Sequence, residues 1–181
     1  MSCGIPFDLI KSVTGANSDE LAALQGRAII GLIEGYLGVT LFKRDFINER
    51  ITVPYAHSKI FKVKHGPLNS VSEMSLITCN AEYQVSNKHL QLGYKVVEVS
   101  GKLPQGIAAV KISYNAGLYS DWGEVPGIIQ QAALDLLKYK FVTDSVAGFT
   151  SEHLGDYSYS KGSIVRGLPA EIAGMLDGVV L

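Results

Sequence analysis

The side chains that most often carry chemistry are few in this chain and stand far apart. Its four histidines are His57, His65, His89 and His153. A metal site usually includes a pair of ligands about three to five residues apart, and no histidine here has a second histidine or a cysteine at that spacing. We therefore expect surface or strand histidines, and the sequence predicts no metal ion.

The acidic residues and the glycine-rich segments also show no pattern of a metal-binding, phosphate-binding or catalytic site. Asp144, Glu152 and Asp156 lie in the Gly-punctuated stretch 143–167, too far apart for a calcium loop, whose ligands alternate closely. The segment 101–106 begins and ends with glycine but lacks the Gly-Lys-Ser/Thr ending of a phosphate-binding loop, so we expect a hairpin turn there. No Gly-x-Ser-x-Gly elbow occurs. The sequence thus predicts no catalytic residue and no cofactor, and a protein that is not an enzyme.

The composition restricts the class of partner. The chain has 181 residues, a net charge of −1 and 18% charged residues, against about 25% in an average protein. Near-neutrality disfavours a nucleic-acid binder, which needs clustered Lys and Arg. The charge deficit fits either a β-rich core or apolar surface buried between subunits. Cys3 and Cys79 form no motif, so we expect both to be reduced thiols in an intracellular protein. No run of apolar residues is long enough to predict a membrane-spanning helix.

Helical periodicity is clearest at 19–37. Apolar residues recur there as one amphipathic stripe made of Leu21, Leu24, Ala28, Leu32 and Tyr36, flanked by Ile29 and Ile33. Asn17 or Ser18 can cap the start of this helix, and Gly38 its end.

Three glycines interrupt the same predicted helix. Gly26, Gly31 and Gly35 each cost about 1 kcal/mol relative to Ala, but small residues at helical spacing let another helix approach closely. That second helix belongs either to the same subunit, in ordinary bundle packing, or to a neighbouring subunit.

Period-two alternation dominates about residues 39–114. Phe61 and Val63, for example, alternate with Lys62 and Lys64, as in a half-buried antiparallel strand. We predict about six strands here, inserted into a helical frame and giving an α+β fold. The frame continues with helices predicted at 126–142, where Pro126 suits the first turn, and at about 168–177. A short helix is also expected at 6–13, and a strand or extended arm near Tyr157.

Short motifs follow one another in a fixed order along the chain. In chain order they are Phe42–Phe46 (FKRDF), Gly66–Val71 (GPLNSV), Val110–Leu118 (VKISYNAGL), Val125-Pro126 before a helix, Gly155–Ser158 (GDYS), Leu168–Ile172 (LPAEI) and Met175–Asp177 (MLD). In their order and spacing, from about residue 19 to 177, these segments resemble the small head–tail connector (adaptor) proteins of tailed phages, which sit next to the portal in the neck. The ending Gly178–Leu181 departs from the Tyr-Arg type finish of that family.

The resemblance implies a structural subunit of the virion neck that forms a ring, expected to be a dodecamer, below the portal. Such a ring extends the DNA channel and docks the next neck or tail component. The implied partners are other copies of the chain, the portal protein and a downstream neck or tail protein. DNA would pass without sequence-specific binding, no membrane is involved, and the protein would be made in the host cytoplasm. We expect a single connector domain over 1–181, with an inserted β region at about 39–114 and an extended C-terminal arm over 143–181.

Two sets of contact residues follow from these expectations. Tyr157 and Tyr159 in the arm, with Ile172 and Leu176 in the last helix, are expected to contact the portal or a neighbouring subunit, because tyrosine buries area at low entropic cost. Packing of the last helix on its own core is the alternative for Ile172 and Leu176. Gly31 and Gly35 are expected at the contact between subunits of the ring.

Two other functions remain open from the sequence. A tail-completion or stopper protein of the same neck would differ in position and not in chemistry. A small-ligand-binding module would need a concave apolar pocket with convergent polar groups.

Overall fold

The computed structural model describes residues 4–53, 58–142, 151–154, 157–160 and 164–179, and between 151 and 160 it describes the backbone alone. The chain divides into two compact units. One contains Met1–Gly38 and Asp121–Leu181, and the other contains Val39–Ser120. Helices and antiparallel sheets are both present, which confirms the predicted α+β class. The organisation as a single connector domain stays a prediction.

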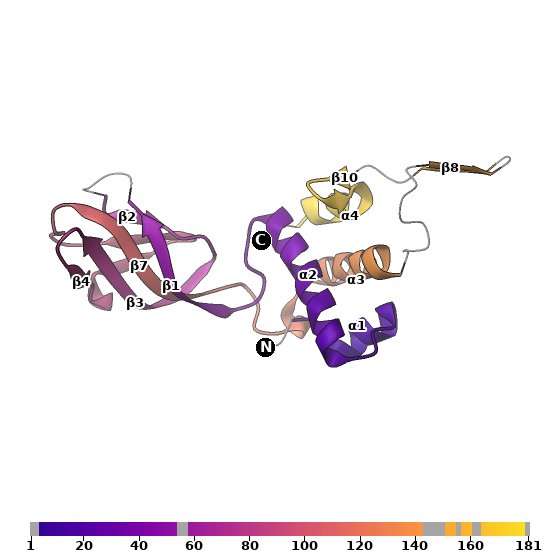
Figure 1. The fold of residues 1–181 in the computed structure, drawn as a ribbon, viewed down its shortest axis with the longest axis horizontal. Helices are drawn as coiled ribbons and strands as arrows, with labels where there is room; N and C mark the ends of the chain where they lie inside the picture. The colour runs from indigo at the N-terminus through magenta and orange to yellow at the C-terminus, as the bar shows by residue number, and fades with distance from the viewer. Residues whose placement is uncertain (1–3, 54–57, 143–150, 155–156, 161–163, 180–181) are drawn as a thin grey trace. The chain divides into compact units, whose positions relative to one another are not determined.

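The first unit is helical. Its helices are α1 (Phe7–Thr14), α2 (Asp19–Leu37), α3 (Gly127–Phe141) and α4 (Ala170–Asp177), joined by the 3-10 turn η2 (Trp122–Glu124) and the strand pair β10 (Ile164–Val165) and β11 (Leu168–Pro169). Helix α3 packs on α1, α2 and α4 (Figure 1). All four helices were predicted, and α2 has the predicted bounds. The Ser18 hydroxyl accepts the Leu21 N–H at its start, and Gly38 ends it with a left-handed φ of 70°.

The buried face of α2 differs from the predicted stripe. Its buried residues are Ala22, Gln25, Gly26, Ile29, Ile30 and Ile33. Leu21 and Leu24, which the stripe placed on the packed face, are 39% and 60% exposed. The prediction failed because α2 carries apolar residues on nearly every side, so periodicity alone does not single out the face that meets α1 and α3. The described residues therefore leave a second, apolar face of α2 uncovered.

The second unit is a two-sheet β sandwich. Its strands are β1 (Arg44–Thr52), β2 (Ile60–Lys62), β3 (Leu68–Thr78), β4 (Glu82–Gln84), β5 (Leu90–Leu92), β6 (Val96–Val99) and β7 (Ile107–Ala116), with the 3-10 turn η1 (Asn87–His89) before β5. One antiparallel sheet has the order β1-β7-β3-β4 and the other the order β2-β6-β5, so that seven strands stand where we predicted about six. The two strands β1 and β2 are each at the edge of a sheet.

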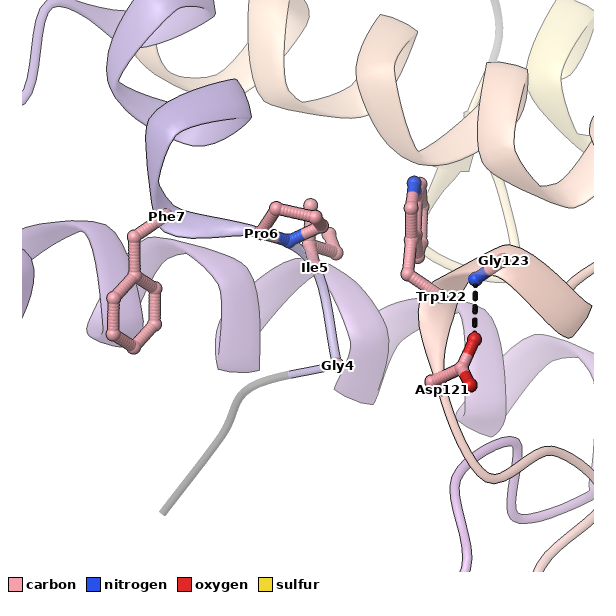
Figure 2. A pocket seen from close by; sticks show the side chains of 7 residues that line it. All are labelled: Gly4, Ile5, Pro6, Phe7, Asp121, Trp122 and Gly123. Atoms are coloured by element: carbon pink, nitrogen blue, oxygen red, sulfur yellow. Dashed lines mark hydrogen bonds between the residues drawn. The ribbon is translucent and has the colours of Figure 1, made fainter.

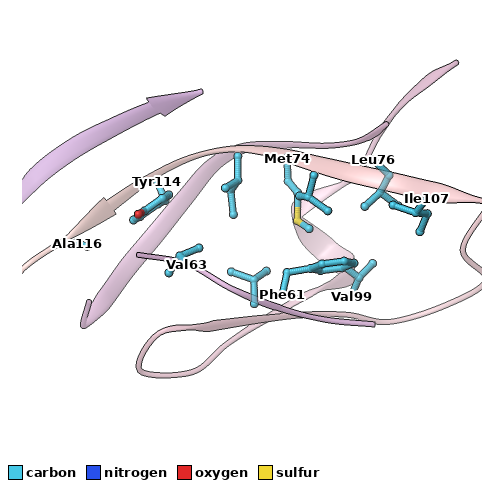
Figure 3. Close-up of a cluster of buried hydrophobic side chains, with 11 residues drawn as sticks. Phe61, Val63, Met74, Leu76, Val99, Ile107, Tyr114 and Ala116 are labelled. Carbon is cyan, nitrogen blue, oxygen red and sulfur yellow. The ribbon is translucent and has the colours of Figure 1, made fainter. Parts of the chain in front are cut away.

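The core of this unit lies between the two sheets. Phe61, Val63 and Val99 project from one sheet toward Met74, Leu76 and Tyr114 of the other (Figure 3). All six are at most 2% exposed, so their burial supplies the main hydrophobic stabilisation of the unit. The alternation of buried Phe61 and Val63 with exposed Lys62 and Lys64 confirms the predicted strand pattern.

The segment 101–106 is not the hairpin turn that we predicted. It connects β6 to β7, and these strands belong to different sheets. Because the turn residues are alike in both cases, local sequence does not tell a hairpin from a crossing between sheets.

A β-hairpin stands apart from both sheets in the pairing pattern. Strand β8 (Ser151–Leu154) pairs with β9 (Tyr157–Ser160), with Leu154 opposite Tyr157 and Glu152 opposite Tyr159. This confirms the predicted strand at Tyr157. These two strands form a sheet of their own, and a two-stranded hairpin is marginally stable in water without a packing partner.

Candidate functional site

The predicted ring-contact glycines lie on the uncovered face of α2. Gly31 and Gly35 are exposed, and a Cβ atom built on either would meet no other heavy atom within 4 Å, apart from its chain neighbours and the local helix backbone. Helix packing inside the helical unit therefore does not require glycine at either position. Gly26, by contrast, belongs to the buried face of the helix.

The same face carries a line of apolar and small side chains. Leu21, Leu24, Ala28, Gly31 and Gly35 follow one another at spacings of three, four, three and four residues, and all five are exposed. We call this line the α2 seam. A 3-4 spacing is the pattern with which one helix packs lengthwise against another. The side chains of the seam become smaller from Leu21 to Gly35, so a partner helix can approach α2 most closely near the C-terminal end of α2.

The predicted contact residues of the last helix have a different environment. Ile172 and Leu176 are 6% and 1% exposed and lie on the buried face of α4. The Tyr36 hydroxyl donates a hydrogen bond of 2.6 Å to the Asp177 carboxylate, which ties α4 to α2. With α4 packed in this way, Ile172 and Leu176 stabilise the helical unit, as in the alternative that we stated from the sequence. Any direct contact of these two side chains with another protein stays a prediction and requires α4 to detach.

The predicted contact residues of the arm lie on strand β9. Tyr157 and Tyr159 are two residues apart on this strand. Their side chains lie outside the described part of the structure, as do Asp144, Asp156 and His57. The contact expected of Tyr157 and Tyr159 therefore stays a prediction.

The motif residues of the β unit hold its sheets together. The Phe46 ring stacks on His65 at 4.0 Å and lies 5.2 Å from the Tyr114 ring, measured between centroids. The Tyr114 hydroxyl donates to the Glu49 carboxylate and accepts the His65 backbone N–H at 3.4 Å. Burial first, and then the bond to Glu49, raise the pKa of the Tyr114 hydroxyl well above its ordinary value. Tyr114 is thus a protonated structural donor at neutral pH.

Gly117, in the same motif as Tyr114, has no room for a side chain. Gly117 has a φ of 136°, and a Cβ there would lie 2.5 Å from the carbonyl carbon and oxygen of Phe42. Beside it, the Asn69 side-chain amide donates to the Gly117 carbonyl at 2.9 Å and to the Asn115 side chain at 3.0 Å. These residues explain the motif by the fold of the β unit, without a ligand.

A surface pocket of about 600 Å³ opens in the helical unit. Trp122 stands opposite Ile5 and Pro6, and Phe7 and Asp121 also line the pocket (Figure 2). The Asp121 carboxylate accepts the Gly123 N–H at 2.7 Å and so caps η2. The pocket offers apolar contact area, but its one ionisable side chain is engaged in the turn.

Two classes of feature are missing from the part of the chain that the structure describes. No three His, Cys, Asp or Glu side chains gather there in a way that could hold a metal ion. Nor does any helix among these residues have the length and hydropathy of a membrane span.

The fold has counterparts among solved structures. A chain in the neck of a native gene transfer agent (GTA) particle with C12 symmetry aligns with 98% of this chain and 93% of its own length, at a TM-score of 0.60 and 18% identity. This chain shares its fold. Two further chains, from the neck of an empty GTA particle with C6 symmetry and from the virion of a native GTA particle, cover 80% and 81% of this chain and 82% and 83% of their own lengths. Both have TM-scores of 0.59 and 21% identity. No protein-family profile and no curated protein matches the sequence.

Proposed function

We propose that this chain is a structural subunit of the neck of a tailed phage or phage-like particle, a head–tail connector that forms a ring below the portal. The observation that carries the proposal is the likeness of fold, over nearly the whole chain, to a chain in a neck with C12 symmetry. A ring of this kind extends the DNA channel and docks the next neck or tail component. The chain performs no catalysis in this role.

The α2 seam is the ring contact in this proposal. A closed ring uses heterologous contacts, in which one face of a subunit meets a different face of the next. The exposed leucines supply apolar area, since Leu24 alone is 60% exposed, and the open space at Gly31 and Gly35 admits a neighbouring backbone. An apolar second face on a long helix is otherwise costly in water, and burial between subunits removes that cost.

The β8–β9 hairpin is the portal contact. Its strands belong to neither of the larger sheets, so pairing with a partner's sheet or packing of Tyr157 and Tyr159 on the portal would stabilise it. Removing everything after Thr150 would be a poor test, because it also deletes α4 with buried Ile172 and Leu176. Replacing residues 151–160 by a Gly-Ser linker leaves α4 in place and isolates the hairpin.

The deciding experiment is negative-stain microscopy with light scattering on the purified chain, alone and mixed with the matching portal. Rings, or monomers that assemble on the portal, are the expected result. The hairpin-replaced variant should stay folded, by circular dichroism, and lose portal binding. A chain that stays monomeric and has no affinity for the portal would overturn the proposal. Binding to a tail protein in place of the portal would instead identify the stopper or tail-completion role.

A further inference from the structure

A second cleft, in the β unit, gathers an unusual share of the positive charge of the chain. It has a volume of about 520 Å³ and is lined by Glu49, Arg50, Ile51, Lys62, Val63, Lys64 and Lys95. Four of the 16 Lys and Arg residues of the chain therefore border one cleft, in a protein whose net charge is −1. Such a grouping attracts an anionic partner.

The one carboxylate in the cleft is already engaged. Glu49 accepts the Tyr114 hydroxyl through one oxygen and the Lys64 backbone N–H, at 3.1 Å, through the other. Both oxygens of Glu49 thus accept hydrogen bonds from within the β unit. The formal charge of the lining residues is thus positive, with Arg50, Lys62 and Lys64 exposed to solvent.

The walls of the cleft are strands at the edges of two sheets. Glu49, Arg50 and Ile51 belong to β1, the edge of the four-stranded sheet, and Lys62 belongs to β2, the edge of the three-stranded sheet. An edge strand presents backbone N–H and C=O groups that can pair with a further strand. The floor of the cleft is apolar, because Val63 belongs to the sandwich core and Ile51 packs against it.

We propose that this cleft binds an extended acidic segment of a partner protein, added as a strand at the edge of the β unit. On β2 and its continuation, Lys62 and Lys64 are two residues apart on one side of the chain, with Val63 turned to the core between them. An extended segment with acidic residues at every second position has the same repeat, roughly 7 Å, so its carboxylates meet the two ammonium groups while its other side chains reach the apolar floor. The inference does not depend on the ring proposal.

The competing explanation is protective. Lysine on an edge strand also prevents unwanted pairing between sheets, and that role needs no ligand. The concave shape, the apolar floor and the added Arg50 and Lys95 favour a bound segment, because a lysine that only blocks pairing needs none of them.

The test uses a short fluorescent peptide alternating Glu and Val, titrated with the full-length chain and followed by anisotropy. We expect saturable binding that weakens about tenfold in the K62Q/K64Q variant, because two exposed charge pairs of ordinary strength are lost. The K88Q/K102Q variant removes the same charge from exposed positions outside the cleft and should bind as the wild type does. Both variants leave the Lys64 backbone bond to Glu49 intact, and circular dichroism checks their fold.

Two further probes separate strand addition from simple charge attraction. A peptide of the same sequence with N-methyl groups along one edge keeps its charge but lacks amide donors, and it should bind more weakly. A short DNA duplex should bind less tightly than the peptide at the same ionic strength. Equal binding of the methylated peptide, preference for DNA, or no saturable peptide binding would each overturn the proposal.

Discussion

Replacing both glycines of the α2 seam by alanine should stabilise the isolated chain and weaken the proposed ring. Each exposed mid-helix Gly→Ala change gains about 1 kcal/mol, since alanine loses less backbone freedom on folding. The G31A/G35A variant avoids steric cost, because no atom outside the local helix lies within 4 Å of either added methyl. We therefore expect about 2 kcal/mol of added stability, which corresponds to a rise in Tm of roughly 4–8 °C for a chain of this size.

The same two methyl groups should act in the opposite direction on assembly. If a neighbouring helix packs against the seam at Gly31 and Gly35, each subunit contact gains atoms where the backbones approach, and overpacking costs about 1–3 kcal/mol. The dissociation constant of a contact should then rise about fivefold to 150-fold. Thermal unfolding measures the first effect, and mass photometry or sedimentation, with and without portal, measures the second.

A matched control separates the two effects. Gly174 in α4 is also helical, exposed and free of atoms within 4 Å of an added Cβ, but it is not on the seam. The G174A variant, with one substitution, should gain about half as much stability, about 1 kcal/mol, and assemble as the wild type does. The reasoning is refuted if G31A/G35A gains stability and still forms rings at the wild-type concentration. If G31A/G35A gains no stability at all, the described exposure of the seam is wrong.

Other predictions concern the fold of each unit. Y114F should cost about 1–3 kcal/mol at pH 7, because the Glu49 carboxylate loses a buried donor, as urea unfolding would measure. Because folding raises the pKa of Tyr114, the contribution of its hydroxyl to stability is complete below the ordinary tyrosine pKa of about 10 and is lost as the pH rises beyond that value. The Y114F variant should therefore lose stability less steeply at alkaline pH than the wild type. An equal dependence of stability on pH in both proteins would contradict this. G117A should destabilise the β unit by more than about 1 kcal/mol, through a positive φ and a close approach to Phe42, whereas G101A, with φ of 100° but open space, should cost less. I172A should destabilise the helical unit by about 2–5 kcal/mol in thermal unfolding; a neutral result would mean that α4 is not packed as described.

Local signals in the sequence located most elements, and their limits are instructive. The caps of α2 were readable because Ser18 and Gly38 satisfy the end groups of the helix by short-range geometry. Its buried face was not readable, because Leu21 and Leu24 are as apolar as Ile29 and Ile33 and only packing with α1 and α3 decides between them. The turn at 101–106 was located but its pairing was not, since sheet order depends on distant strands.

Some of the candidate contact residues could be recognised from the sequence, and others could not. Gly31 and Gly35 could be picked out because glycine in a helix interior needs a reason, and their exposure now directs attention to a partner outside the chain. Ile172 and Leu176 were chosen for apolar character, which does not distinguish a core from an interface. The basic cleft was missed because Arg50, Lys62, Lys64 and Lys95 are spread over three segments, and only the sandwich brings them to one opening.

The base of the β unit has a consequence for how such chains diversify. Where the β unit begins and ends, the Lys43 N–H donates to the Tyr119 carbonyl at 2.8 Å, and the Tyr119 N–H donates to the Leu41 carbonyl at 2.8 Å. Phe42 and Tyr119 form a parallel bridge, so entry and exit are clasped by the unit's own backbone. An insertion closed in this way behaves as a cassette. It adds little to the entropic cost of bringing the helices on either side of it together, and it can be exchanged for another insertion without changes in the sequence of those helices. Excised as residues 39–120, it should fold alone, and a related chain can change this unit while its helical frame stays the same.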